Sequence, residues 1–156
     1  MRMENPVVPN NPDIKETLRR QRALFATGRT KDVAFRIEQL RTLKKVIKQF
    51  ESRLFDAIRE DLNKPKFEAY MTEIGPIYSE IGMMIRRLRW WAAPKPKVTP
   101  LEHLPAMSYV VPEPYGVALI ISPWNYPFNL VMAPLIGAIA AGNCAMVKTG
   151  HASVHT

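Results

Sequence analysis

An uncharged stretch of 34 residues, from Pro114 to Val147, limits what this 156-residue chain can fold into. A segment without Asp, Glu, Lys or Arg is suited to burial, either in a bilayer or inside a folded domain. A membrane-spanning helix needs about 20 consecutive apolar residues. Prolines and asparagines instead divide this stretch into short pieces, at Pro123, Asn125, Pro127, Asn129, Pro134 and Asn143. We therefore expect the buried part of a folded domain and no integral membrane segment.

The same stretch carries the pattern of a strand, a helix and a second strand over residues 116–148. Residues 117–121 form a continuous apolar run, typical of a strand covered on both faces. Residues 126–141 predict a helix, with Pro127 in the first turn and Gly142-Asn143 at the end. Residues 144–148 predict a second short strand. This βαβ unit predicts two parallel strands with a right-handed crossover, and hence the α/β fold class.

Helical patterns occupy residues 13–91, after a proline-rich segment at 1–12 that we expect to be an extended leader. The first helix is expected from Asp13, with Gly28 as its stop. A longer one is expected from about Asp32 to Asn63, since its apolar residues recur at steps of three and four. A third is predicted from Phe67 to Trp91, with a kink at the interior Gly75-Pro76 pair.

The segment between the helices and the βαβ unit is rich in proline. Residues 92–100 predict a proline-rich connector. Within 98–113, alternating residues at 107–111 predict a half-buried strand that Pro112 ends.

Charge is concentrated in the first part of the chain. The net charge is +8; residues 1–97 carry 21 basic and 12 acidic residues, a balance of +9, and residues 98–156 have a balance of −1. Basic clusters at 86–89 and Lys44-Lys45 are the feature that would favour a protein that binds nucleic acid or an anionic membrane. Acidic residues are interleaved through most of the helical part, which favours a solvated helix face and no nucleic-acid partner.

Several kinds of site lack their residues in this sequence. The glycine-rich phosphate-binding motifs do not occur, and the three histidines (His103, His151, His155) show no metal-ligand spacing, so no metal is expected. Cys144 is the one cysteine and lies within a predicted apolar strand, which favours an inert core thiol over a reactive one. A lone thiol and no signal-peptide pattern in the first thirty residues predict a cytoplasmic protein.

The remaining candidates follow the two predicted parallel strands. Ligands of open α/β sheets bind beyond the carboxyl ends of such strands. Residues 122–125 (Ser-Pro-Trp-Asn) lie at the first strand end. The Asn125 amide either donates to a developing oxyanion or caps the following helix. Lys148, at the second strand end, either contacts a cofactor or is a solvated residue.

Two segments make the sequence resemble the aldehyde dehydrogenase superfamily: residues 112–128, around Pro123-Trp124-Asn125, and residues 134–143. The nearest branch is similar to the class 3, fatty-aldehyde type, whose opening resembles residues 24–30 and 36–40. The resemblance covers about residues 13–148. It implies that residues 13–156 are an incomplete Rossmann-like NAD(P)-binding domain: N-terminal helices, a strand region at 98–113 near the subunit contact, and one βαβ unit.

The resemblance also implies roles for individual residues. Asn125 matches the asparagine that stabilises the oxyanion formed when a cysteine thiolate attacks the aldehyde. Ser122, Pro123 and Trp124 match the turn that lines the cofactor cleft, and Lys148 matches the lysine that bonds the adenosine ribose of NAD or NADP. Cys144 matches a variable strand position and not the nucleophile.

Two departures from the family pattern shape the expected function. Residues 149–151 (Thr-Gly-His) replace the usual Pro-Ser-Glu, which predicts weak or absent cofactor binding here. Family members are also much longer, and their nucleophilic cysteine and general-base glutamate match nothing in these 156 residues. We therefore expect the N-terminal part of an NAD(P)-dependent aldehyde dehydrogenase, inactive by itself and taking an aldehyde substrate in the intact enzyme. The alternative is a non-catalytic module that forms a homo-oligomer or pairs with a full-length relative.

Overall fold

The computed structural model describes residues 13–156 of the chain, so the expected leader at 1–12 lies outside the described residues. Its fold is mixed α/β, which confirms the predicted class. The helical elements, in chain order, are α1 (Ile14–Ala26), α2 (Val33–Leu62), α3 (Lys66–Ala69), the π-helix η2 (Tyr70–Ile74), α4 (Gly75–Ala92) and α5 (Asn129–Ala141). The strands are β1 (Lys95–Lys97), β2 (Ser108–Val110), β3 (Val117–Ile121) and β4 (Cys144–Lys148).

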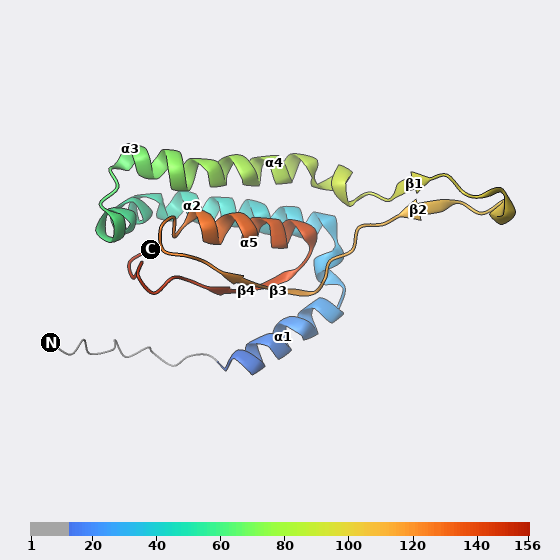
Figure 1. The fold of residues 1–156 in the computed structure, drawn as a ribbon, viewed down its shortest axis with the longest axis horizontal. Helices are drawn as coiled ribbons and strands as arrows, with labels where there is room; N and C mark the ends of the chain where they lie inside the picture. The colour runs from blue at the N-terminus through green and yellow to red at the C-terminus, as the bar shows by residue number, and fades with distance from the viewer. Residues whose placement is uncertain (1–12) are drawn as a thin grey trace.

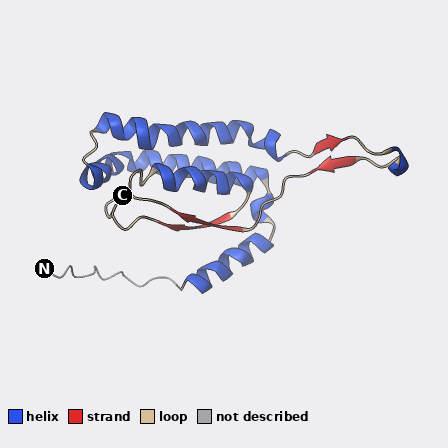
Figure 2. Cartoon of the chain, viewed as in Figure 1, coloured by secondary structure: helices blue, strands red, loops and turns tan. Residues whose placement is uncertain are grey.

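Three helices form the main layer of the molecule, with a small sheet against one side of it (Figure 1). Helices α2, α4 and α5 pack against one another, and α5 also contacts both β3 and β4. The strands form two separate pairs, β1 with β2 and β3 with β4 (Figure 2). The first pair projects away from the helical layer, whereas the second lies beneath α5 (Figure 1).

Helix α2 has the bounds that its end residues predict. The Asp32 side chain accepts a hydrogen bond from the Ala34 amide at 2.9 Å and so caps the first turn. Asn63 ends the helix with a φ of 53°, in the left-handed region that asparagine tolerates. The buried face of α2 packs with α4 and α5 in a core whose fully buried aliphatic side chains are Leu40, Ile58, Ile74, Ile77, Ile81 and Ile136. Each such side chain contributes about 1.5–3 kcal/mol of transfer free energy.

The helix predicted from Phe67 to Trp91 is present as a continuous helical run over residues 66–92, and directly before the Gly75-Pro76 pair it contains a π-helical turn. The Gly75 amide donates to the Tyr70 carbonyl five residues earlier. A β-carbon at Gly75 would lie 2.9 Å from that oxygen, so the turn requires glycine. Pro76 has no amide hydrogen and cannot bond the carbonyl of Thr72. The Gly-Pro pair therefore produces a widened turn rather than a simple bend.

The proline-rich connector at 92–100 contains strand β1, which was not predicted from the sequence. Strands β1 and β2 pair antiparallel, with Pro96 opposite Tyr109. The Thr99 hydroxyl also accepts from the Ser108 amide at 3.0 Å, which closes this end of the hairpin. Pro96 is tolerated because both strands are edges of a two-stranded pair.

Strands β3 and β4 are parallel, with Val117 opposite Cys144 and Ile121 opposite Lys148, as the βαβ pattern predicts. Helix α5 joins them, but it begins at Asn129 and not at the predicted Tyr126. It ends at Ala141, and the following Gly142 has a φ of 89°, in the left-handed region that suits glycine. A β-carbon at Gly142 would lie 2.8 Å from the guanidinium of the buried Arg36. Helix α1 contacts both strands, and its Gln21 side chain donates to the Ala145 carbonyl at 2.8 Å.

Candidate active site

The turn between β3 and α5 holds four of the five predicted site residues. Ser122 is buried, and its hydroxyl donates to the Pro123 carbonyl at 3.1 Å, so it shapes the turn from inside. Pro123, Trp124 and Asn125 are exposed, and Trp124 has 57% of its surface accessible. The turn therefore presents an indole ring and a primary amide to solvent at the carboxyl end of a parallel strand.

The structure decides between the two predicted roles of Asn125 on one point. The N-cap position of α5 is Phe128, whose side chain makes no capping hydrogen bond. Asn125 lies four residues before the first helical residue, so the helix-cap interpretation is wrong. Within residues 13–156 the Asn125 side-chain amide has no hydrogen-bond partner, which leaves its donors free for a ligand.

Lys148 comes next to this turn through the pairing of the two strands. The Ser122 amide donates to the Lys148 carbonyl at 3.0 Å. A β-carbon at Gly150 would lie 3.2 Å from the Pro123 carbonyl carbon and from the Trp124 nitrogen, so the two loops pass each other closely. The exposed Lys148 ammonium contacts the Thr149 carbonyl at 3.4 Å, and no carboxylate in the described part of the chain pairs with it. The strand ends thus bring all five predicted residues together.

Two charged residues behind the turn were missed at the sequence level. The Lys64 ammonium lies 2.7 Å from Glu73 Oε1, 3.3 Å from the Asn125 carbonyl oxygen and 3.9 Å from the centre of the Tyr126 ring. Glu73 Oε2 accepts from the Asn129 amide at 3.0 Å. The Glu73 side chain is fully buried, whereas 11% of the Lys64 side chain is exposed. The sequence signal that could have indicated this pair is the carboxylate of Glu73 on an apolar helix face, because carboxylates are almost never fully buried unless they are paired.

Cys144 has the features of a structural thiol, in line with its predicted role. It is half-buried in β4, and its Sγ donates to the Gln21 carbonyl at 3.6 Å. Burial raises the pKa of the Cys144 thiol, which lowers the fraction of nucleophilic thiolate at neutral pH.

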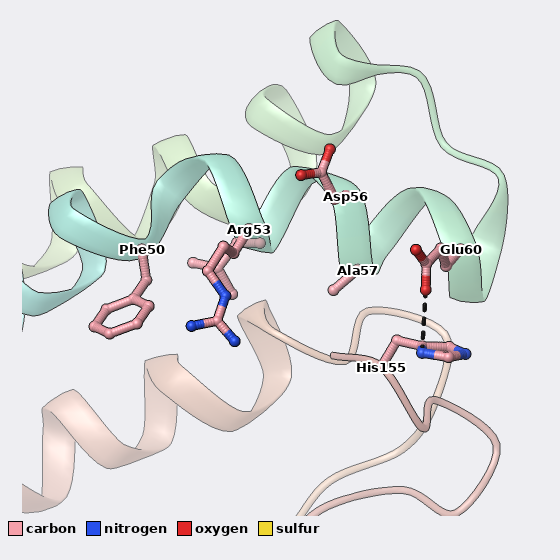
Figure 3. A pocket seen from close by; sticks show the side chains of 7 residues that line it. Phe50, Arg53, Asp56, Ala57, Glu60 and His155 are labelled. Atoms are coloured by element: carbon pink, nitrogen blue, oxygen red, sulfur yellow. Dashed lines mark ion pairs between the residues drawn. The ribbon is translucent and has the colours of Figure 1, made fainter.

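The three histidines are exposed, and one of them joins a contact that was not predicted. His155 Nδ1 lies 3.1 Å from Glu60 Oε2, beside a cavity of about 550 Å³ along α2 (Figure 3). The cavity is lined by Phe50, Arg53, Leu54, Asp56, Ala57, Glu60 and His155, none of which is a predicted site residue.

Asp61 holds the segment after β4 against α2. Its carboxylate accepts from the amides of His155 and Thr156, and from the Thr156 hydroxyl at 2.7 Å. Burial alone would raise the pKa of Asp61, but these hydrogen bonds outweigh it and leave the pKa lowered.

No helix within residues 13–156 is both long and apolar enough to cross a membrane. No group of three or more metal-ligating side chains gathers in the same residues.

Known proteins that this chain resembles are aldehyde dehydrogenases. The model of the aldehyde dehydrogenase family matches residues 8–156. A 4,4'-diaponeurosporen-aldehyde dehydrogenase of Staphylococcus aureus is 51% identical over 127 residues, which are 81% of this chain and 28% of that protein. A dimeric NADP-preferring aldehyde dehydrogenase of Canis lupus familiaris is 41% identical over 140 residues, 90% of this chain and 31% of that protein.

Solved structures give the same result for the fold. The substrate-bound Staphylococcus aureus AldH superposes with a TM-score of 0.87 and 46% identity, over 92% of this chain and 32% of that one. A succinic semialdehyde dehydrogenase of Streptococcus pyogenes with NADP⁺ superposes with a TM-score of 0.76 at 18% identity, over 94% of this chain and 31% of that one; this likeness concerns the fold alone. The chain thus spans 28–32% of the length of these relatives.

Proposed function

Because this chain belongs to the aldehyde dehydrogenase family, we propose that it supplies the oxyanion donor and part of the cofactor cleft of an enzyme that oxidises aldehydes to carboxylic acids. The observation that carries the proposal is the exposed, unpartnered Asn125 amide in the turn after β3, beside the end of β4. Family and strand-end geometry point to the same place in the fold.

The proposed role of Asn125 is electrostatic. When a thiolate attacks the aldehyde carbon, negative charge develops on the former carbonyl oxygen. The neutral Asn125 amide donates a hydrogen bond to that oxygen without changing its own charge. One such donor in a preorganised site typically contributes about 3 kcal/mol to transition-state stabilisation.

The residues at the two strand ends fit a dinucleotide. Lys148 presents an ammonium without a carboxylate partner in the described residues, suited to ribose hydroxyls or phosphates, and Trp124 presents an exposed ring. We propose that Pro123, Trp124 and Lys148 contact NAD or NADP, while Ser122 fixes the turn that carries them. When bound, the nicotinamide accepts a hydride from the substrate carbon. Residues 149–151 offer no carboxylate to the ribose, so we propose weak binding.

The proposal assigns no nucleophile to these 156 residues. Cys144 is the one cysteine in the sequence, and its raised thiol pKa and its place in β4 make it unsuited to attack a carbonyl. We therefore expect no aldehyde oxidation by the 156-residue chain alone. Incubation with NAD or NADP and a panel of aliphatic and aromatic aldehydes should give no reduced cofactor by absorbance. Turnover that survives repurification and disappears in Cys144→Ser would contradict this assignment.

The decisive experiment changes Asn125 in an active aldehyde dehydrogenase that carries residues 1–156 as its N-terminal segment. Asn125→Ala should lower kcat by roughly 10²–10³-fold, because one oxyanion donor is lost. Asn125→Asp should be at least as damaging, since it has the same size but places negative charge beside the oxyanion. Tyr126→Phe, one residue away, keeps the ring above Lys64 and should retain near-normal kcat. A near-normal kcat in Asn125→Ala would refute the proposal.

A second role, as an interaction module, is favoured by the β1–β2 hairpin. The hairpin projects from the body of the molecule (Figure 1) and exposes large apolar side chains. Val98 is 95% exposed, Leu101 83% and Met107 77%. We propose that the hairpin contacts a second subunit, either another copy or a full-length relative. Replacing Val98 and Leu101 by Ser should reduce the mass measured by light scattering if copies of this chain associate through the hairpin.

A further inference from the structure

A fully buried carboxylate lies directly behind the turn that carries Asn125. Glu73 belongs to η2, and both of its carboxylate oxygens are used: Oε1 pairs with Lys64 at 2.7 Å and Oε2 accepts from the Asn129 amide at 3.0 Å. Lys64 follows α2 and also donates to the carbonyl oxygen of Asn125 at 3.3 Å. The turn is therefore connected to Glu73 both through Lys64 and at the first residue of α5.

We propose that Glu73 and Lys64 are positioning residues for the oxyanion donor Asn125. Lys64 fixes the Asn125 backbone carbonyl and so the direction of the side-chain amide, and Glu73 holds the Lys64 ammonium in place. This inference rests on the proposed function, because it concerns how accurately the Asn125 amide meets the reacting oxygen.

The π-helical turn explains why Glu73 can act on α5. Pro76 has no amide hydrogen to donate to the Thr72 carbonyl. The Thr72 carbonyl oxygen instead accepts from the Asn129 side-chain amide at 2.8 Å. Thr72 and Glu73, adjacent in η2, therefore bind the side chain and the backbone amide of the same residue. The start of α5, four residues after Asn125, is fixed at two points by one turn.

A simple ion pair with Glu73 would not require Lys64 to contact the Asn125 carbonyl as well. The pair with Glu73 already neutralises both charges, yet the ammonium also reaches the Asn125 carbonyl and lies over the Tyr126 ring. Within the described residues the Asn125 side chain has no partner of its own, so its orientation depends on its backbone. A displacement of about 1 Å in a catalytic group can cost roughly 100-fold in rate.

The test compares variants of Lys64 and Glu73 in an active aldehyde dehydrogenase that carries these 156 residues. Lys64→Gln and Glu73→Gln should lower kcat by roughly 10- to 100-fold, with the KM for aldehyde within about twofold of the parent. Lys64→Arg keeps the cation and should recover most of the loss. Lys48→Gln is the matched control, because the Lys48–Glu51 pair lies along α2 and does not contact the turn.

A double variant separates this role from the proposed function. In the Asn125→Ala background, Lys64→Gln should lower kcat no further, because the group it positions is gone. If Asn125→Ala lowers kcat but Lys64→Gln does not, the positioning role is wrong and the proposed function stands. If Lys64→Gln lowers kcat by its full factor in both backgrounds, Lys64 does not act through Asn125 and the inference fails. A normal kcat in Asn125→Ala refutes both.

Amide hydrogen exchange on the same active enzyme shows whether the effect is local. Lys64→Gln should speed exchange in peptides covering residues 122–130 while leaving α2 and α4 within about twofold of the parent. Faster exchange throughout α2 and α4 would mean that the pair holds the whole fold, and would overturn the positioning role.

Discussion

The helical layer and the β3–β4 sheet contain similar apolar residues but bury them to different extents. Ile58, Ile77 and Ile136 in the layer have no exposed surface, whereas Leu119 and Ile121 in β3 are 66% and 65% exposed. Ile120, between them on the opposite face of the strand, is 7% exposed. The layer thus completes its core within residues 13–156, whereas one face of β3 stays largely exposed.

This difference shows how to interpret the uncharged stretch. Its strands have the continuous apolar composition of a parallel sheet covered on both faces. Within the described residues both α5 and α1 contact the two strands, yet Leu119 and Ile121 stay largely exposed. Apolar composition therefore indicates the burial that a strand is suited to, not the burial that these residues provide.

The largest expected effect comes from one substitution made in both regions. Ile58→Ala should lower the free energy of unfolding by about 2–5 kcal/mol, because it opens a cavity in a closed core. Ile121→Ala, the matched change on the open face of β3, should alter it by less than about 0.5 kcal/mol. Urea titration followed by far-UV circular dichroism measures both. Equal losses would show that the open face is packed in solution.

An intermediate effect is expected from a charge on the open face of the sheet. We expect the parent chain to be helical, dye-binding and prone to associate, with its loose packing at the exposed face of the sheet. Leu119→Lys should weaken self-association roughly tenfold and lower the fluorescence of a bound hydrophobic dye, because a buried Leu contributes about 1.5–3 kcal/mol. Analytical ultracentrifugation and dye titration provide the measurements.

The control for that prediction is Lys44→Gln on the exposed side of α2, which should leave association unchanged. A monomeric parent with a sharp cooperative melt would contradict the expected loose packing and association.

The smallest expected effect is pH-dependent and concerns the contact between the helical layer and the segment after β4. The folded-state pKa of Asp61 is lowered from 3.8. Its contribution to stability is therefore fully present above that value and is lost as pH falls through the lower folded-state pKa. Asp61→Asn should cost up to about 1 kcal/mol at pH 7, and the difference from the parent should vanish once the pH lies below the lowered folded-state pKa.

Urea titrations at several pH values measure this difference directly, since the other titrating groups are common to both proteins. Thr156→Val removes the hydroxyl that donates to Asp61 at 2.7 Å and should show a smaller loss with the same pH dependence. A difference that grows as pH falls would reverse the assigned sign.

Much of the fold could be predicted because its signals are local. Asp32 and Asn63 mark the ends of α2, and the apolar period of three and four marks its buried face. The order of apolar runs around Gly142-Asn143 predicts β3, α5 and β4. The site was predicted from a contiguous motif at the end of β3, and Lys148 from its place at the end of β4.

The errors occur where distant residues decide the outcome. Helix α5 starts three residues later than predicted, and the turn before it and its first residue contact Lys64 and Glu73, which are far away in sequence. Strand β1 exists because β2 lies opposite it and supplies its hydrogen bonds. The Lys64–Glu73 pair itself joins the residue after α2 to η2 and has no contiguous motif.

The sequence alone thus determines where helices and strands can form and which strand ends carry polar groups, because these depend on backbone preferences and on spacing within one element. The tertiary structure decides which carboxylate can be buried, which carbonyl that lacks an amide partner finds a donor, and how Asn125 is held. Glu73 is a charged residue in a helical pattern until Lys64 and the Asn129 amide come within 3.0 Å of it. Burying a charge is costly unless it is paired, and only the folded chain supplies the partners.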